Sequence, residues 1–257
     1  MAVGHRLYGD GPEGVVVLIG WLGDHTVFEP MLDALDASRN TYLFVDCRGY
    51  GLSRGYQGPF TMLRYAQDAL EAADELGWES FHVVGHSMGG NAVQRLLTLA
   101  RERIQSLVAM TPVPASGVPM EGEQLALFEG AADEPANRRA IIDFTTGSRL
   151  GDAWLDRMVE GSLQACERDA FAAYLQSWSK DSFVEEVNGA STPMKVLVGE
   201  HDHALTPEVM HATFLEWYPQ AELEGLPNAG HFPMAEIPIH LATVIDRFVA
   251  AHTQALA

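Results

Sequence analysis

Short apolar runs alternate with longer segments of helical periodicity along the chain. The segments between the runs repeat apolar positions at helical spacing, and the clearest of them begins after Thr61, which can cap it, and stops at Gly77. Such an alternation is typical of a mostly parallel sheet flanked by helices, so the sequence predicts the α/β class. The predicted strands cover residues 15–19, 42–45, 81–84, 104–110, 194–198 and 221–226.

The stretch 113–190 breaks this alternation, because it has almost no strand signal and contains several amphipathic helical patterns. Phe171, Tyr174 and Trp178 recur at helical spacing in one of them, which is more typical of core packing than of a cofactor site. We predict that residues 113–190 form a helical cap inserted before the last two strands. Residues 1–112 and 191–257 would then form the core, which ends in a helix over 238–251.

The first candidate for chemistry is Gly-His-Ser-Met-Gly at residues 85–89, which fits Gly-x-Ser-x-Gly between a predicted strand and a predicted helix. A turn sharp enough to lift the Ser87 hydroxyl clear of the sheet leaves room only for small neighbours. The start of the following helix also offers free backbone N–H groups and a positive dipole end to an oxyanion. The sequence therefore predicts that Ser87 is a nucleophile.

A serine hydroxyl needs a base to take its proton and a carboxylate to orient that base. Asp202 follows the predicted strand 194–198, so it lies past the carboxyl end of a strand, where this fold class places its working loops. His231 comes later, after the predicted strand 221–226. The chain order Ser87, Asp202, His231 is the order of α/β hydrolases, so we predict these three residues to be a catalytic triad.

Further motifs extend this pattern over nearly the whole chain. Residues 46–53 read Asp-Cys-Arg-Gly-Tyr-Gly-Leu-Ser, and residues 111–114 read Thr-Pro-Val-Pro where the cap is predicted to begin. Together with the serine motif and its partners, they resemble the α/β-hydrolase superfamily, in the capped group of esterases, carbon–carbon bond hydrolases and haloperoxidase-like enzymes. The resemblance implies that Asp46 and Arg48 brace their loop and take no part in catalysis.

The resemblance also implies an oxyanion hole formed by the backbone amides of Trp21 and Met88. The family usually has His-Gly-x in the first of these loops, whereas this chain has Ile-Gly-Trp at residues 19–21. The departure removes a histidine that usually braces the loop, but the backbone donor remains. Only the bracing is put in doubt.

Other residues are candidates for substrate contact. Asp24 precedes a predicted helix near Thr26, so a capping role is favoured for it over a contact with substrate. The histidines near the site are scattered over strands and turns without the spacing of metal ligands, and we expect neither a metal nor a cofactor. The predicted substrate contacts are His25, His86, Trp154, Trp178 and Phe232.

The charge and cysteine content of the chain limit the kinds of partner and the cellular compartment that we expect. The formal net charge is −19, from 35 acidic and 16 basic residues, so nucleic acid and anionic membranes are unlikely partners by charge. Cys47 and Cys166 show no metal or redox spacing, which favours free thiols in a reducing compartment. We see no signal peptide or spanning segment and expect a cytoplasmic protein. Its predicted partner is a small molecule; a homo-oligomer is possible.

The predicted function is a serine hydrolase of the carboxylesterase type, acting on a small to medium ester, lactone, thioester or related carbonyl compound through an acyl-enzyme on Ser87. One alternative is a cofactor-independent dioxygenase of N-heteroaromatic substrates, because residues 20–25 and 230–233 resemble such enzymes on the same fold. In that group the acid follows the strand before the cap, where residues 109–112 hold none. A second alternative is a low-turnover ligand receptor that retains the triad.

Overall fold

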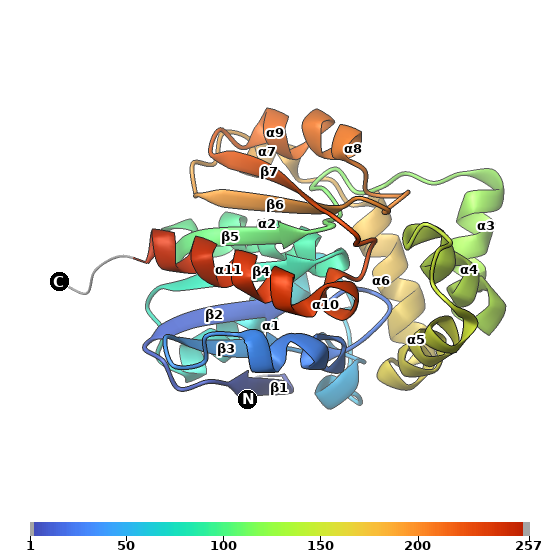
Figure 1. The fold of residues 1–257 in the computed structure, drawn as a ribbon, viewed down its shortest axis with the longest axis horizontal. Helices are drawn as coiled ribbons and strands as arrows, with labels where there is room; N and C mark the ends of the chain where they lie inside the picture. The colour runs from blue at the N-terminus through green and yellow to red at the C-terminus, as the bar shows by residue number, and fades with distance from the viewer. Residues whose placement is uncertain (1–2, 254–257) are drawn as a thin grey trace.

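The computed structural model describes residues 3–253, which contain a seven-stranded sheet with the order β1-β3-β2-β4-β5-β6-β7 (Figure 1). Strand β1 is antiparallel to β3, and every other neighbouring pair is parallel. The predicted α/β class is confirmed. The strands are β1 (His5–Tyr8), β2 (Glu13–Leu18), β3 (Asn40–Val45), β4 (Phe81–His86), β5 (Ile104–Met110), β6 (Met194–Gly199) and β7 (Ala221–Leu226).

The central strands are apolar because both faces of a parallel sheet are covered by helices. All six residues of β4 are buried, and five of the six in β2 are. Strand β1 was missed from the sequence, because it is a four-residue antiparallel edge strand with no fully buried residue and thus no apolar run.

Helices cover the two faces of the sheet. In Figure 1, α11 and α10 lie in front of the sheet with the 3-10 helix η1, and α1 and α2 lie behind it. The predicted caps are confirmed: Thr61 accepts a hydrogen bond from the Arg64 N–H, and Asp24 accepts one from the Thr26 N–H. The core helices are η1 (His25–Ala34), η2 (Gly51–Ser53), α1 (Met62–Glu75), α2 (Met88–Ala100), η3 (Arg101–Arg103), α8 (Pro207–Ala212), α9 (Phe214–Trp217), α10 (Pro233–Glu236) and α11 (Pro238–His252).

Four helices form a separate group at one end of the sheet (Figure 1). They are α3 (Gly122–Gly130), α4 (Pro135–Thr145), α5 (Asp152–Ala165) and α6 (Arg168–Lys180), all inserted between β5 and β6. We call them the cap helices. The short helix α7 (Val184–Val187), which also falls within the predicted cap, contacts α2 of the core. Among residues 3–253, no helix has the length and apolar character needed to cross a bilayer.

Candidate active site

Ser87 lies in the sharp turn between β4 and α2. Its backbone has φ 53° and ψ −114°, a conformation that non-glycine residues rarely adopt. The surrounding backbone is close enough that a Cβ on Gly85 would lie 2.4 Å from the Gly89 carbonyl oxygen, and one on Gly89 would lie 2.3 Å from that of Leu18. Small residues are therefore required on both sides of Ser87, as the motif indicates.

The turn brings Ser87 to the two residues predicted to act with it. Ser87 Oγ lies 2.9 Å from His231 Nε2, and His231 Nδ1 lies 2.7 Å from Asp202 Oδ2. Asp202 Oδ1 accepts backbone hydrogen bonds from Ala204 and Leu205 at 2.9 and 3.1 Å. The three side chains come from the loops after β4, β6 and β7, so the parallel sheet collects them at the carboxyl ends of its strands.

Electrostatics favour an ionised Asp202. Burial alone raises the pKa of this carboxyl, but the charge and hydrogen bond of His231, together with the two backbone N–H donors, outweigh burial and lower the pKa below its ordinary value. An ionised carboxylate at this position accepts the Nδ1–H of His231. The tautomer that results leaves the lone pair of Nε2 directed at the Ser87 hydroxyl.

The backbone of His231 is held by residues around it. Its N–H donates to the Thr145 carbonyl of α4 at 3.0 Å, and its carbonyl accepts from His86 Nε2 at 2.7 Å and from the Thr111 hydroxyl at 3.2 Å. Burial and the neighbouring His231 lower the pKa of His86 to about 3, so His86 is neutral in the working pH range. Since its Nε2 is the donor, its Nδ1 is unprotonated, and this atom has no hydrogen-bond partner within residues 3–253.

The predicted oxyanion residues lie beside Ser87. Met88 is the first residue of α2, and Trp21 lines a cavity of about 40 Å³ together with Ser87 and His231. The loop that carries Trp21 lies close to the His86 ring, because a Cβ on Gly20 would lie 2.6 Å from His86 Nδ1.

A second cavity, of about 190 Å³, is also lined by Ser87 and His231. It is mostly apolar and is walled partly by the cap. Of its twelve lining residues, only Ser87, Trp178 and His231 were predicted as site residues, and those not predicted include Phe128, Phe144 and His203. Phe144 is exposed and lies edge-on to His203, with ring centroids 5.5 Å apart. The lining residues are Ser87, Val113, Val118, Met120, Gln124, Phe128, Phe144, Trp178, His203, Ala204, Leu205 and His231.

The structure brings some of the predicted substrate contacts to these cavities and leaves others outside them. Trp178 lines both cavities, and His86 and Phe232 line the smaller one. Trp154 instead lines a separate cleft of about 330 Å³ between α5 and η1, and it packs edge-on against Phe232. His25 lines neither cavity at Ser87.

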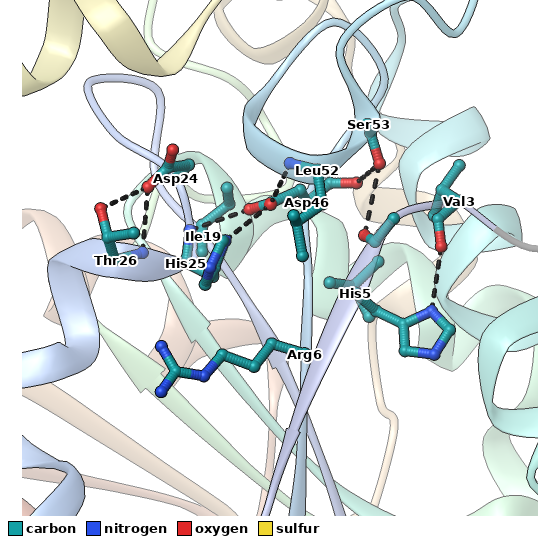
Figure 2. Close-up of polar contacts among 12 residues, drawn as sticks. Val3, His5, Arg6, Ile19, Asp24, His25, Thr26, Asp46, Leu52 and Ser53 are labelled. Carbon is teal, nitrogen blue, oxygen red and sulfur yellow. Dashed lines mark hydrogen bonds and ion pairs between the residues drawn. The ribbon is translucent and has the colours of Figure 1, made fainter.

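Figure 2 shows where His25 is held. Its Nδ1 lies 2.7 Å from Asp46 Oδ2, and Asp46 also accepts the backbone N–H groups of His25 and Leu52, both at 2.8 Å. Arg48 forms a two-point ion pair with the buried Asp68 of α1. Asp46 and Arg48 therefore brace the loop after β3, as the resemblance implies.

A larger cavity, of about 570 Å³, lies away from this chemistry. Its walls include Glu13, Asn40 and Asp246, and none of Ser87, Asp202 and His231 reaches it. Within residues 3–253, no group of three or more His, Cys, Asp or Glu side chains is arranged to hold a metal ion.

Comparison with known proteins places the chain in a family. Residues 14–238 match the α/β hydrolase fold family. The chain belongs to this family. It is 27% identical over 214 residues to a 2-hydroxymuconate semialdehyde hydrolase of Pseudomonas putida, covering 80% of this chain and 75% of that protein. It is 26% identical over 254 residues to a pimeloyl-[acyl-carrier protein] methyl ester esterase of Nitrosomonas europaea, covering 93% and 96%.

Solved structures of other α/β hydrolases have the same fold. An esterase from Exiguobacterium antarcticum superposes with a TM-score of 0.85 at 18% identity, over 96% of this chain and 94% of that one. A thermophilic esterase from Thermogutta terrifontis gives a TM-score of 0.82 at 23% identity, over 97% and 94%. The family and the relatives together support a hydrolase.

Proposed function

We propose that the protein is a serine hydrolase that cleaves a carboxylic ester or a related carbonyl compound through an acyl-enzyme on Ser87. The observation that carries the proposal is the continuous chain of contacts from Ser87 Oγ to His231 Nε2 at 2.9 Å and from His231 Nδ1 to Asp202 at 2.7 Å, beside an apolar cavity. Nucleophile, base and orienting carboxylate at hydrogen-bond distance are the requirements for serine acyl transfer.

Each group has one role in the proposed reaction. His231 Nε2 takes the hydroxyl proton as Ser87 Oγ attacks the carbonyl carbon, and the amides of Trp21 and Met88 stabilise the oxyanion that forms. When the intermediate collapses, His231 returns the proton to the leaving alkoxide, and the acyl group stays on Ser87. A water molecule, deprotonated by His231, then attacks the acyl carbon. The bond to Ser87 Oγ breaks as His231 returns the proton to this oxygen, which releases the acid and regenerates Ser87. Asp202 keeps the imidazole oriented and stabilises its protonated form throughout.

The 190 Å³ cavity supports a neutral apolar acyl group of modest size. An engineered cavity of roughly 150 Å³ lined by apolar side chains binds benzene, so the volume here fits a phenyl ring or a short alkyl chain. Its lining residues include neither lysine nor arginine. A carboxylate moved into it would lose its water without gaining a fixed cationic partner, which is costly. We therefore expect butyryl or benzoyl esters to be preferred over esters of dicarboxylic acids.

The two alternatives receive less support. For a dioxygenase, the acid would follow β5, where Thr111 stands and donates its hydroxyl to the His231 carbonyl, while His231 is paired with Asp202. A low-turnover receptor would have the same geometry as a hydrolase, so only the rate of release from the acyl-enzyme separates the two.

The proposal also includes a small-molecule substrate, and the cap at 113–190 would form one wall of the substrate pocket.

The test is a comparison of wild type with Ser87→Ala. Intact-protein mass spectrometry after treatment with a fluorophosphonate should show one adduct, on Ser87, in wild type alone. Wild type should also turn over p-nitrophenyl butyrate and benzoate steadily, and p-nitrophenyl hemisuccinate at least roughly ten times more slowly, because the cavity supplies no fixed cation to the succinyl carboxylate. An unlabelled Ser87 would contradict the proposal, and a burst without later turnover would favour the receptor. Oxygen consumption with hydroxyquinolones would favour the dioxygenase.

A further inference from the structure

The residue expected to supply the oxyanion amide belongs to the core, but its side chain is surrounded by cap residues. The Trp21 ring stacks on Phe171 of α6, with centroids 3.9 Å apart and planes 18° apart. It is also nearly parallel to Phe128 of α3, at 5.8 Å, and edge-on to Trp178 of α6, at 5.6 Å. Such ring pairs restrict the orientation of both partners.

Hydrogen bonds anchor the two ends of Trp21 to different parts of the molecule. The indole Nε1–H donates to the backbone carbonyl of Phe171 at 2.8 Å, which links the side chain to α6. The backbone carbonyl of Trp21 accepts from the Tyr50 hydroxyl at 3.0 Å, which links the main chain to the loop after β3. The cap thus makes a direct polar contact with the oxyanion loop.

Phe171 is itself held from within the cap. The guanidinium carbon of Arg138, on α4, lies 3.9 Å from the Phe171 ring centroid, within the range of a cation–π contact. Arg138 is only 2% exposed and donates to the carbonyls of Ala131 and Ser162, both at 2.8 Å. A buried cation that bonds to backbone carbonyls ties three cap segments together and fixes its own position. Phe171 therefore has little freedom to move away from Trp21.

We infer that Phe171 is a positioning residue for the oxyanion hole: the cap, through Phe171, holds Trp21 and thereby places the backbone amide of Trp21 beside Ser87. The inference rests on the proposed hydrolase function. It answers the question raised by Ile19, which stands where the family usually has a histidine that braces this loop. Phe171 lines neither cavity at Ser87, so its effect on turnover passes through Trp21 and not through contact with substrate.

A consequence concerns the cap as a whole. Because the brace comes from α6, the oxyanion hole is complete only while α6 is seated on the loop that carries Trp21. A displacement of the cap that widens access to Ser87 also removes the support of the oxyanion donor.

The experiment compares Phe171→Leu with Phe183→Leu. Both changes replace a buried phenylalanine by leucine, but Phe183 packs under Arg95 near α2 and takes no part in the site. We expect Phe171→Leu to lower kcat about 10- to 100-fold with KM changed less than about 3-fold, because loss of an oxyanion donor costs 10²- to 10³-fold and displacement costs less. A trifluoromethyl ketone, which forms an oxyanion on the serine, should lose affinity in parallel. Phe183→Leu should leave both quantities within about 3-fold of wild type.

A second variant guards against misfolding of the first. Trp21→Phe keeps a ring against Phe171 but loses the indole donor to its carbonyl, and we expect a smaller fall in kcat of about 3- to 10-fold. The inference is overturned if Phe171→Leu has the same kcat and ketone affinity as Phe183→Leu. If Phe171→Leu fails to fold, the inference is overturned if Trp21→Phe has the kcat of wild type. Fluorophosphonate labelling of Ser87 in wild type separates these outcomes from a failure of the hydrolase proposal itself.

Discussion

Two histidine–aspartate pairs in this molecule have almost the same geometry. In each, the imidazole Nδ1 lies 2.7 Å from a carboxylate oxygen, in the pair His231–Asp202 and in the pair His25–Asp46. Both carboxylates are buried, both follow the end of a parallel strand, and both accept two backbone N–H groups. A carboxylate-bound imidazole is therefore not by itself a sign of catalysis in this fold.

The difference lies at the other ring nitrogen. His231 Nε2 meets the Ser87 hydroxyl and borders both cavities, whereas the His25 ring, in the described part of the chain, is bonded to Asp46 and to no serine or cysteine. The strained turn at Ser87 creates this distinction, because it lifts a hydroxyl to the base of one pair only. An orienting pair becomes a catalytic one when a nucleophile and a cavity are added to it.

Removal of the imidazole should give the largest difference between the two pairs. His231→Gln, like Ser87→Ala, should abolish ester turnover, with kcat reduced by about 10⁴-fold or more, because no base remains for the serine. His25→Gln should keep kcat within about 5-fold of wild type, since its ring touches neither Ser87 nor the cavities. Steady-state kinetics with p-nitrophenyl butyrate provide the measurement. Equal losses in the two variants would refute the assignment of His25 as a brace.

Substitution of each aspartate by asparagine should affect kcat in one pair and stability in the other. Asp202→Asn should lower kcat by about 10³- to 10⁴-fold, because an amide favours the wrong tautomer of His231. Asp46→Asn should affect mainly stability, lowering the free energy of unfolding by roughly 2–4 kcal/mol, because the buried hydrogen bonds of a charged acceptor weaken. Ester kinetics and urea unfolding on both variants test this. A normal kcat for Asp202→Asn would overturn the choice of acid.

Much of this arrangement was predictable from the sequence because it depends on local geometry. The strand–turn–helix setting of Ser87 and the strands preceding Asp202 and His231 are patterns in a short stretch of chain, and a parallel sheet brings strand ends together. The capping role of Asp24 was predictable for the same reason: it depends on two neighbouring residues.

The remainder depends on contacts between distant segments. His25 was predicted to touch substrate, but its position is set by Asp46, which is 21 residues away in the loop after β3. Phe128, Phe144 and His203 line the 190 Å³ cavity at Ser87 because cap helices pack over the loop after β6, and no local pattern marks that packing. The same holds for Trp21: the sequence shows the missing histidine of its loop, but not that Phe171 lies against its ring.

The pair His25–Asp46 should make the free energy of unfolding depend on pH. The hydrogen bond to Asp46 raises the pKa of His25, against the opposing effect of burial. A raised pKa in the folded state stabilises the fold fully below the ordinary histidine pKa of about 6.5, and the contribution is lost as pH rises through the raised value. His25→Gln should therefore cost about 1–3 kcal/mol at pH 5.5 and less at pH 8.5. Urea unfolding at the two pH values measures this; an equal cost at both would contradict an ionised pair.

The smallest expected effect concerns a third histidine, His86, which touches the catalytic pair without joining its chemistry. Its Nε2–H donates to the His231 carbonyl, and its pKa of about 3 keeps it neutral, so it orients His231 without titrating near neutral pH. We expect His86→Leu to lower kcat by roughly 5-fold, about the value of one hydrogen bond, and His86→Gln to recover most of it, because an amide can donate to the same carbonyl.

The pH profile of kcat/KM distinguishes this role from that of a base. Since His86 binds no proton between pH 5 and 9, it contributes no limb to the profile in this range, and the profile of His86→Leu should have the same shape as that of wild type. Measurement with p-nitrophenyl butyrate over this range tests the point. A limb that moved or disappeared in His86→Leu would mean that His86 titrates in the active enzyme. The assignment of His86 as a residue that only orients His231 would then be wrong.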